Sequence, residues 1–436
     1  MESLTRKTAI DLYTEALAEI RPEILVRKAL TAEGEILRIR FLDRDIPVPL
    51  DSDGRLVLLS IGKAAAPMAA EAARLLGPRI TEGLVVTKTG FSLPSPVFPT
   101  IEAGHPVPDQ RGAEASEQVT EMITGLGEKD LVLVLLSGGA SALLPAPLEG
   151  ISLAEKQALI NGMLSRAMNI HQINQVRKAI SRFKGGGLAA LAAPARVVTL
   201  ALSDVPGDHF ASIGSGPTCP EPVDAPAVIG LLQTFDLWQS AAPSIREALQ
   251  TGAVQRVKGR TMPAPINGLI GNNALLLQAL RNTANRHGIA AFVVDHQVTG
   301  DNREARNFLL SRWEAIRKEI PHGPLCMVAG GETVVEVTGG GMGGRCQELA
   351  ALMLPEVGAE EIFLAAGSDG NDGPTDAAGG VVDQESFLRM ESEQIPWRDL
   401  LREHDSYHLL ERTGNLIRVS PTRNNLMDLY FFLRKR

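Results

Sequence analysis

A run of six apolar residues, Leu131 to Leu136, most strongly constrains how this chain can fold. It continues directly into Ser137-Gly138-Gly139-Ala140-Ser141. A short, continuous apolar run with this ending predicts a strand covered on both faces, as in a parallel sheet. A similar order of apolar strand, glycine-bearing loop and helix extends from Leu56 to Leu76. Because strands that alternate with helices build right-handed βαβ units, the sequence predicts an α/β fold with a mainly parallel sheet.

The length of the chain predicts two domains. A chain of 436 residues exceeds the size that one hydrophobic core normally serves, and prolines concentrate between residues 217 and 265. We therefore expect one domain at residues 1–250 and a smaller α/β domain at residues 251–436. A helix is expected at Thr5 to Ile20 in the first domain, and a strand at Ile266 to Ile270 in the second.

The smaller domain contains a glycine-rich stretch between Met327 and Asp383. A strand is expected at Leu325 to Ala329, where Gly330 and Gly331 should interrupt it. The alternating run Thr333 to Val337 follows after only a few residues and predicts a second strand. Such close succession predicts antiparallel pairing, and hence a mixed sheet.

Composition excludes several classes of partner. The net charge of −8 and the absence of a Lys/Arg block argue against nucleic acid. The first residues form no apolar signal-peptide core and no run reaches the length of a membrane span, so we expect a cytoplasmic protein with no membrane partner. Cys219, Cys326 and Cys346 lack the spacing of a disulfide framework or a zinc site. The oligomeric state stays open between monomer and homodimer.

Two glycine-bearing loops are candidate phosphate sites. The first comprises Ser137, Gly138, Gly139 and Ser141, where backbone N–H groups at the end of a buried strand could bind an anion. It lacks the spacing of a Walker or dinucleotide motif, so a tight structural turn is the alternative. Its serines also keep acyl transfer open as a reaction class. The second loop, Lys184, Gly185 and Gly186, has a helix cap as its alternative.

Two further cations are candidate catalytic residues. Lys63 follows the strand expected at Leu56 to Leu59, where it could deliver a point charge, although a lysine there is usually solvated. Arg345 lies between a glycine and an expected helix, and could bind a carboxylate or a phosphoryl group bidentately. Its alternative is a structural salt bridge. His105, in a proline-containing loop, is a weaker candidate base.

Acidic side chains follow several expected strands. Carboxylates in such positions suit Mg²⁺, which takes one or two of them together with water and phosphate oxygens. Asp204 and Glu332 are the first expected ligands, and Asp369 is an expected base or supporting group. Asp372 belongs to the same cluster, but acids and amides in turns also serve local hydrogen bonding.

Eight short motifs, taken together and in order, resemble the glycerate 2-kinase family of the MOFRL type, in which some members carry the name hydroxypyruvate reductase. The motifs span nearly the whole chain, and are Ser60-Ile61-Gly62-Lys63, Glu102-Ala103-Gly104-His105-Pro106-Val107-Pro108-Asp109, Ser137-Gly138-Gly139-Ala140-Ser141, Asn174-Gln175-Val176-Arg177-Lys178, Lys184-Gly185-Gly186-Gly187, Ser203-Asp204-Val205-Pro206-Gly207-Asp208, Gly330-Gly331-Glu332-Thr333 and Gly367-Ser368-Asp369-Gly370.

The resemblance implies a fold and a reaction. It implies a Rossmann-like N-terminal domain, a smaller C-terminal domain and a cleft between them. It also implies ATP- and Mg²⁺-dependent phosphorylation of D-glycerate to 2-phosphoglycerate, with Lys63 and Arg345 as the family's functionally important lysine and arginine. Near the C-terminus the family usually has Gly-Pro-Thr-Gly-Thr-Asn, whereas this chain reads Ser420-Pro421-Thr422-Arg423-Asn424-Asn425. Both loop glycines are therefore replaced.

Two other functions remain as alternatives. The second family name suggests an NAD(P)H-dependent reductase of hydroxypyruvate, but no G-x-G-x-x-G motif follows the early strands. A non-catalytic sensor of a sugar acid or a nucleotide would use the same loops. In-line phosphoryl transfer fits the residues best, because it relies on positioning and charge neutralisation and needs no protein nucleophile.

Overall fold

The computed structural model describes residues 4–252 and 262–435, which form two compact units. The parallel-sheet unit consists of residues 25–203 and 208–270, and the mixed-sheet unit of residues 1–24, 204–207 and 271–436. The units therefore interleave along the chain, while the expected division into residues 1–250 and 251–436 stays a prediction. No helix of the described chain is long and apolar enough to cross a membrane.

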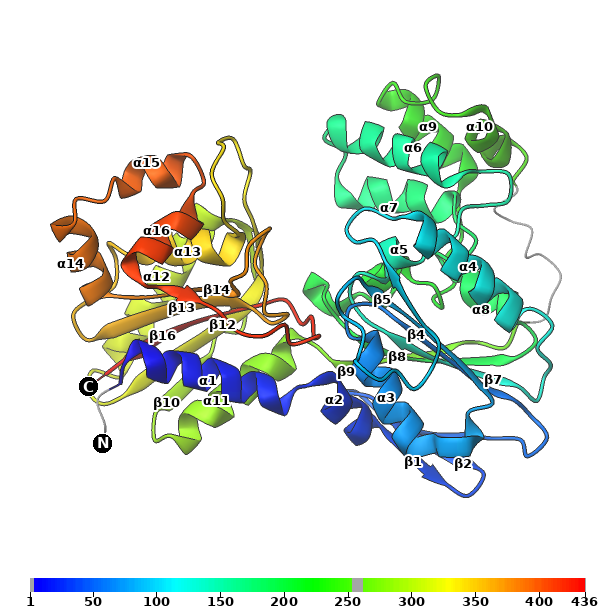
Figure 1. Ribbon diagram of the computed structural model, residues 1–436, viewed down its shortest axis with the longest axis horizontal. Helices are drawn as coiled ribbons and strands as arrows, with labels where there is room; N and C mark the ends of the chain where they lie inside the picture. The colour runs from blue at the N-terminus through cyan, green and yellow to red at the C-terminus, as the bar shows by residue number, and fades with distance from the viewer. Residues whose placement is uncertain (1–3, 253–261, 436) are drawn as a thin grey trace. The chain divides into compact units, whose positions relative to one another are not determined.

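A six-stranded sheet forms the centre of the parallel-sheet unit (Figure 1). Its strands are β4 (Leu56–Ile61), β5 (Glu82–Lys88), β6 (Thr100–Ala103), β7 (Leu131–Leu136), β8 (Arg196–Leu202) and β9 (Ile266–Gly271). Their order is β6-β5-β4-β7-β8-β9, the strand order of the Rossmann fold, which confirms the predicted fold. β9 lies beyond residue 250 and pairs with β8 in this sheet.

The order places a topological switch point between β4 and β7. From β4 the chain proceeds to β5 on one side, whereas β7 lies on the other side of β4. β4 and β7 are parallel, with Ile61 opposite Leu136, so their carboxyl ends lie side by side. In open α/β sheets, ligands bind at such a point because the loops that leave the two strands diverge there.

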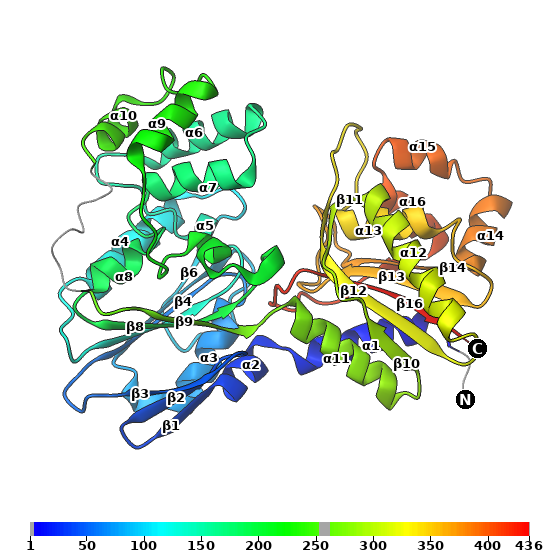
Figure 2. The ribbon, with the colours of Figure 1, turned by 180° about the vertical axis from the view of Figure 1, so that it is seen from behind.

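Helices and a small sheet surround this core (Figure 2). They are α3 (Ala65–Leu76), η1 (Gly77–Arg79), α4 (Gln110–Ile123), α5 (Ala140–Leu143), α6 (Leu153–Ser165), α7 (Ile170–Ala179), α8 (Gly187–Ala192), η3 (Phe210–Ser215), α9 (Ala225–Thr234) and α10 (Pro243–Gln250), with the antiparallel strands β1 (Leu30–Glu33), β2 (Ile36–Arg40) and β3 (Asp45–Pro49). The short helices α2 (Pro22–Ala29) and η2 (Pro206–Asp208) each have residues in both units. Helices α6, α7, α9 and α10 share a separate apolar core that includes Met163, Val176 and Leu232.

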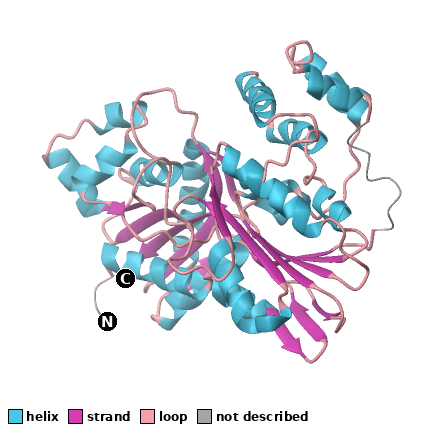
Figure 3. Ribbon diagram, turned by 45° about the vertical axis from the view of Figure 1, so that its right-hand side comes forward, coloured by secondary structure: helices cyan, strands magenta, loops and turns pink. Residues whose placement is uncertain are grey.

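The mixed-sheet unit contains seven strands, which Figure 3 shows by secondary structure. They are β10 (Ala290–Val293), β11 (Val298–Asp301), β12 (Leu325–Val334), β13 (Glu361–Gly367), β14 (Gly379–Asp383), β15 (Leu416–Ile417) and β16 (Asp428–Arg434). The helices are α1 (Arg6–Glu19), α11 (Asn273–Arg286), α12 (Asn302–Glu319), α13 (Arg345–Met353), α14 (Gln384–Ser392), α15 (Trp397–Arg402) and α16 (Ser406–Thr413). β10 and β11 pair parallel with β12, and β16 lies antiparallel between β12 and β13, so the predicted mixed sheet is confirmed.

The second strand that was predicted to make this sheet mixed does not form. β12 continues without interruption to Val334, and residues 335–344 form a loop, so no second strand forms at Thr333 to Val337. Gly330 and Gly331 are needed for close packing within a strand: a Cβ atom would lie 2.3 Å from Asn273 Oδ1 at the first and 2.1 Å from the Val298 carbonyl oxygen at the second. The glycine pair therefore marks close neighbours and not a turn.

The first helix packs in the C-terminal half of the chain. The helix expected at Thr5 to Ile20 is confirmed as α1, and it lies beside α11 in Figures 1 and 2. Its buried Tyr13 hydroxyl donates a 2.6 Å hydrogen bond to the carbonyl oxygen of Gly367, at the end of β13. The N-terminal helix therefore packs within the mixed-sheet unit.

Candidate functional site

The exits of β4 and β7 are joined by hydrogen bonds. The N–H group of Lys63 donates to the Gly138 carbonyl oxygen at 2.9 Å, and the N–H group of Ala64 donates to Ser137 Oγ at 3.0 Å. Gly62 has a φ of +126°, and a Cβ atom there would lie only 2.2 Å from Ser137 Oγ. A glycine is therefore required at residue 62 so that the two loops can meet. The candidate catalytic residue Lys63 and the first predicted phosphate loop thus lie together at the switch point.

Gly139 lies between two candidate residues. Its φ is +88°, and a Cβ atom there would lie 3.1 Å from His105 Cδ2 and 3.5 Å from Lys63 Cγ. Both side chains consequently flank the same glycine turn. The N–H groups of Gly138 and Gly139 form no hydrogen bond with any residue that the structure describes. They are therefore available to an oxyanion.

Four elements meet at the start of α5. Arg177 on α7 donates a 2.5 Å hydrogen bond to Ser141 Oγ, and Ser141 Oγ lies 2.9 Å from the Oγ of Ser215, at the end of η3. The ammonium group of Lys184 donates to the Ser141 carbonyl oxygen at 2.8 Å. The predicted residues Ser141 and Lys184 are thus close together. Sequence reasoning assigned no role to Arg177 or Ser215, although Arg177 lies within one of the eight motifs.

The cations near α5 are buried. Lys184 is 4% exposed and Lys156 is 2% exposed. Burial lowers the pKa of Lys184 well below its usual value, and nearby Lys156 and Arg177 lower it further. Burial, with Arg177 and Arg182, lowers the pKa of Lys156 to about 7. The charged form of each lysine is therefore disfavoured unless an anion lies nearby.

The second predicted phosphate loop uses its own N–H groups within the protein. Gly185 donates to the Ser215 carbonyl oxygen at 3.0 Å and Gly186 to that of Gly216 at 2.7 Å. Gly186 has a φ of +88°, and a Cβ atom there would lie 2.5 Å from Pro220 Cα. Packing therefore accounts for this glycine, and Lys184 can contribute to anion binding only through its side chain.

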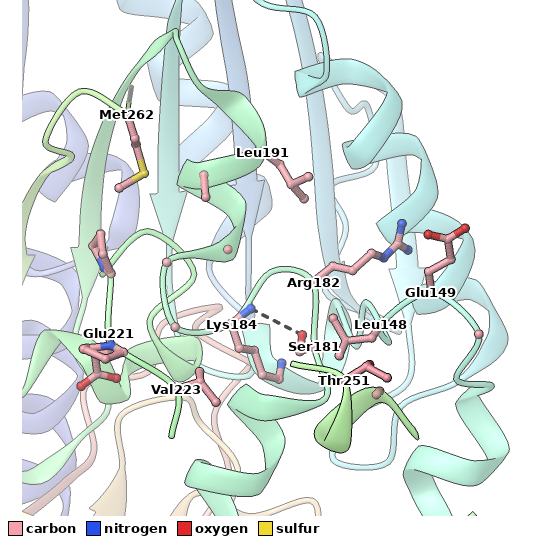
Figure 4. A pocket seen from close by; sticks show the side chains of 18 of the residues that line it. Leu148, Glu149, Ser181, Arg182, Lys184, Leu191, Glu221, Val223, Thr251 and Met262 are labelled. Carbon is pink, nitrogen blue, oxygen red and sulfur yellow. Dashed lines mark hydrogen bonds between the residues drawn. The ribbon is translucent and has the colours of Figure 1, made fainter. Parts of the chain in front are cut away.

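A cavity of about 1010 Å³ borders this loop (Figure 4). In Figure 4, Lys184 and Ser181 lie on one wall, where the Lys184 N–H group donates to Ser181 Oγ at 3.4 Å. Arg182, Glu149 and Glu221 also line the cavity. The lining thus combines charges of both signs, and the cavity belongs entirely to the parallel-sheet unit.

Arg345 is the centre of an ion-pair network in the mixed-sheet unit. Its Nε and Nη2 donate to the two carboxylate oxygens of Asp428 at 2.6 and 2.8 Å, and its Nη1 lies 3.2 Å from Glu332 Oε1. The Asp428 side chain is 1% exposed, whereas that of Glu332 is 37% exposed. Burial opposes the guanidinium charge, but the Asp428 carboxylate more than offsets this and raises the pKa of Arg345. The predicted alternative of a salt bridge is therefore present.

Sequence reasoning did not identify Asp428. It is the first residue of β16 and stands in register with Gly331 of β12 and Gly367 of β13, so it lies where both of these strands pass a glycine. The Tyr430 hydroxyl donates to Asp428 Oδ2 at 3.0 Å. The run Leu429 to Leu433, apolar and rich in aromatic residues, was the signal that could have predicted the strand.

Asp369 and Asp204 both contact the altered C-terminal loop. The Thr422 N–H group donates to the Asp369 carbonyl oxygen at 3.1 Å, and Asn425 Nδ2 donates to Asp204 Oδ2 at 3.2 Å. A Cβ atom on Gly367 would lie 3.3 Å from Asp369 Oδ1 and 3.6 Å from Asp428 Oδ1. Asp369 therefore lies near Asp428, and the loop at residues 420–425 connects two of the predicted acidic residues.

Asp372 has a structural role at the start of α13. Its oxygens accept hydrogen bonds from the N–H groups of Cys346 at 3.2 Å and Gln347 at 2.8 Å. Burial, reinforced by Asp428, raises the pKa of Asp372 to about 7 despite these bonds. A Cβ atom on Gly344 would lie 2.3 Å from the Asp372 carboxyl group. Asp372 thus serves as an acceptor for the α13 N-terminus.

The acidic residues that follow the strands offer oxygen ligands for magnesium. Within the described parts of the chain, no three or more His, Cys, Asp or Glu side chains are grouped so that they could hold a metal ion. Mg²⁺ needs only one or two protein carboxylates when phosphate oxygens and water complete its shell. Asp204 and Glu332 belong to the same compact unit and offer the oxygen donors that Mg²⁺ prefers. Their chemistry therefore fits a metal shared with a bound phosphate.

Comparisons with known proteins cover almost the whole chain. Family models match residues 8–250, described as "Domain of unknown function (DUF4147)", and residues 325–428, described as the MOFRL family. A D-glycerate 2-kinase of Thermotoga maritima is 37% identical over 94% of this chain and 98% of the relative. A putative hydroxypyruvate reductase of Agrobacterium vitis is 35% identical over 86% and 98%, respectively. The crystal structure of glycerate kinase from Thermotoga maritima matches with a TM-score of 0.83 and 35% identity, covering 98% of this chain and 99% of that one.

Proposed function

This chain belongs to the glycerate 2-kinase family of the MOFRL type, and we propose that it transfers the γ-phosphoryl group of ATP to the 2-hydroxyl of D-glycerate. The products are ADP and 2-phosphoglycerate. The observation that carries the proposal is the switch point, where Lys63 flanks Gly139 and its N–H group donates to the Gly138 carbonyl oxygen at 2.9 Å. A lysine beside free N–H groups at the end of a parallel sheet suits the binding of phosphate.

Residues of the parallel-sheet unit position the phosphates in this proposal. The Gly138 and Gly139 N–H groups and the Lys63 ammonium group bind phosphate oxygens, and Ser137 holds the two loops together through Ala64. These contacts act by orientation and by neutralising charge, which are the main contributions of a protein to phosphoryl transfer. No serine needs to act as a nucleophile, so the acyl-transfer reading is not supported.

Residues of the mixed-sheet unit supply charge, a base and oxygen ligands in this proposal. Arg345 neutralises charge on the transferring group, and Asp369 accepts the proton of the attacking hydroxyl. Asp204 and Glu332 are the proposed Mg²⁺ ligands. When bound, the metal would offset the charge of the ATP phosphates. The predicted interdomain cleft, the cytoplasmic location and the oligomeric state remain predictions.

The reaction can be tested directly with purified protein. We expect D-glycerate, ATP and Mg²⁺ to yield a product that enolase converts at once to phosphoenolpyruvate, because enolase accepts 2-phosphoglycerate and not the 3-isomer. Lys63→Ala and Arg345→Ala should each lower kcat/KM at least about a hundredfold, as expected when a charge that stabilises a transition state is removed. If both act on one transition state, the double variant will lose less than the product of the single losses. A product accessible to enolase only after phosphoglycerate mutase is added would refute the assigned position.

The reductase reading has its own test. The similarity to a putative hydroxypyruvate reductase is the observation that keeps it open. Hydroxypyruvate with NADH or NADPH should give no change in absorbance at the nicotinamide band beyond that of a protein-free control. Oxidation of the nicotinamide without any kinase activity would reverse the proposal. Absence of both activities would favour a sensor.

A further inference from the structure

Three cations near Ser141, of which two are buried and one is partly buried, have no acidic partner. Lys156, Arg177 and Lys184 form no salt bridge with a carboxylate in the described parts of the chain, and their hydrogen bonds are to hydroxyl or carbonyl oxygens. By contrast, neighbouring Lys178 pairs with Glu221, and Arg182 pairs with the Glu117 side chain. The missing counter-ion is thus a property of this group and not of the whole region.

Burying cations without a counter-ion is costly. A lysine can escape the cost by losing its proton, and the lowered pKa values of Lys156 and Lys184 agree with this. Arg177 cannot, because a guanidinium group stays protonated in proteins. Its Nε is buried and has no hydrogen-bond partner in the described structure. At least one permanent positive charge therefore lacks compensation, which a bound anion would provide.

Arg177 and its neighbours have the geometry to receive such an anion. Arg177 and Ser141 are only partly buried, so a ligand can reach them. Ser215 and Lys184 are 2% and 4% exposed, and both form hydrogen bonds with Ser141. The hydroxyl oxygens of Ser141 and Ser215 lie 2.9 Å apart, so one hydroxyl donates to the other, and the second keeps its hydrogen for an oxygen acceptor. The start of α5 also follows directly after Gly139, which Lys63 flanks. The group therefore adjoins the proposed phosphate loop.

We propose that Arg177, Ser141, Ser215 and Lys184 form an oxyanion site that binds a phosphoryl or carboxylate group of the ligand. This proposal rests on the kinase function only for the identity of the anion, which is a nucleotide phosphate or the carboxylate of the sugar acid. Arg177 supplies a fork of N–H donors, which suits both groups. Lys184 supplies an ammonium group, whose charged form a bound anion would stabilise.

Anion binding can be measured without any enzyme activity. Inorganic phosphate is titrated against the purified chain at constant ionic strength, and the thermal unfolding midpoint is recorded. Phosphate should raise the midpoint of the wild type saturably, because a ligand that binds only the folded state stabilises it. The half-saturating concentration should increase at least tenfold in Arg177→Gln and less in Arg177→Lys, which keeps the charge.

A matched control removes the same charge elsewhere. Arg166 directly follows α6, which shares an apolar core with α7, the helix of Arg177. Its side chain is exposed and donates only to the carbonyl oxygens of Phe235 and Asp236. Arg166→Gln should leave the phosphate titration unchanged. Ser215→Ala, which changes no charge, should weaken phosphate binding if the hydroxyl is a ligand. Equal titrations for the wild type, Arg177→Gln and Ser215→Ala would overturn the proposal.

Kinetics then identify the anion. If the site binds a nucleotide phosphate, Arg177→Gln raises KM for ATP and leaves KM for D-glycerate unchanged; if it binds the carboxylate, the effects are reversed. Phosphate binding through Arg177 without any phosphoglycerate formation would refute the proposed function and leave this site standing. Full kinase activity with an unchanged phosphate titration in Arg177→Gln would refute this site and leave the proposed function standing.

Discussion

Replacing Asp428 by asparagine should destabilise the mixed-sheet unit by about 3 kcal/mol. The substitution removes the charge that faces Arg345 and turns one of the two oxygen acceptors, at 2.6 and 2.8 Å, into a donor. Breaking a buried ion pair by removing one partner costs about 3–5 kcal/mol, and each hydrogen bond to a charged group contributes about 1.5–3 kcal/mol. We take the lower end because the Arg345 side chain is 34% exposed and keeps Glu332 as a partner.

Urea unfolding with tryptophan fluorescence can report on this unit separately. Trp313 is 2% exposed and stacks on Phe432 of β16, with ring centroids 5.1 Å apart, so its emission follows the sheet that contains Asp428. Trp238 belongs to the other unit and is replaced by phenylalanine in every sample. Asp399→Asn is the matched control, since its pair with Arg402 is exposed and should contribute less than about 1 kcal/mol.

A double variant can show whether Arg345 and Asp428 stabilise the unit as a pair. If Arg345 and Asp428 stabilise the unit as a pair, the effects of Arg345→Met and Asp428→Asn will be strongly non-additive in the double variant. The Asp428→Asn variant should also lose turnover with D-glycerate, because Arg345 loses the partner that orients it. A change in unfolding free energy below about 1 kcal/mol, together with additive effects, would show that the buried pair is not a source of stability.

Three further substitutions test other features. Arg423 occupies a family glycine position at a φ of +54°, so Arg423→Gly should raise the unfolding free energy by about 1 kcal/mol in urea; a decrease would mean that its side chain contributes more than the strain costs. Gly331→Ala should destabilise the chain by several kcal/mol, since its Cβ would meet the Val298 carbonyl oxygen at 2.1 Å, whereas Gly340→Ala, with nothing within 4 Å, should cost about 1 kcal/mol or less. Because burial lowers the pKa of Lys156 to about 7, the unfolded state binds more protons above that pH, and the stability of the wild type relative to Lys156→Met should rise from pH 7 towards pH 10 in phosphate-free buffer; a flat difference would mean that Lys156 keeps its charge.

The parallel-sheet unit was the part best predicted from the sequence. The strand at Leu131 to Leu136 has the predicted bounds. This strand is a continuous apolar run, whose burial on two faces is a local signal. The contact between Lys63 and the loop after β7 was expected only in general terms. It depends on β4 and β7 being neighbours, and the strand order cannot be deduced from a single sequence.

The mixed-sheet unit was harder to predict because its features depend on register. Gly330 and Gly331 look like a turn in the sequence, yet they lie within β12 since neighbouring side chains and carbonyl groups leave no room for a Cβ atom. Asp428 becomes the partner of Arg345 only through the pairing of β16 between β12 and β13. Arg177 was missed for a similar reason: its missing counter-ion can be recognised only when every neighbouring acid is located.

The two partners of Arg345 allow a division of roles that the sequence did not indicate. Asp428 is almost fully buried and binds both Nε and Nη2, so it fixes the plane of the guanidinium group without help from solvent-exposed residues. The Glu332 side chain is 37% exposed, and its Oε1 lies 3.2 Å from Nη1. An incoming oxyanion can therefore replace Glu332 at Nη1 while Arg345 keeps its orientation. On this view, the salt-bridge and substrate-binding interpretations of Arg345 are compatible: the buried half of the network holds the arginine, and the exposed half is the part that exchanges.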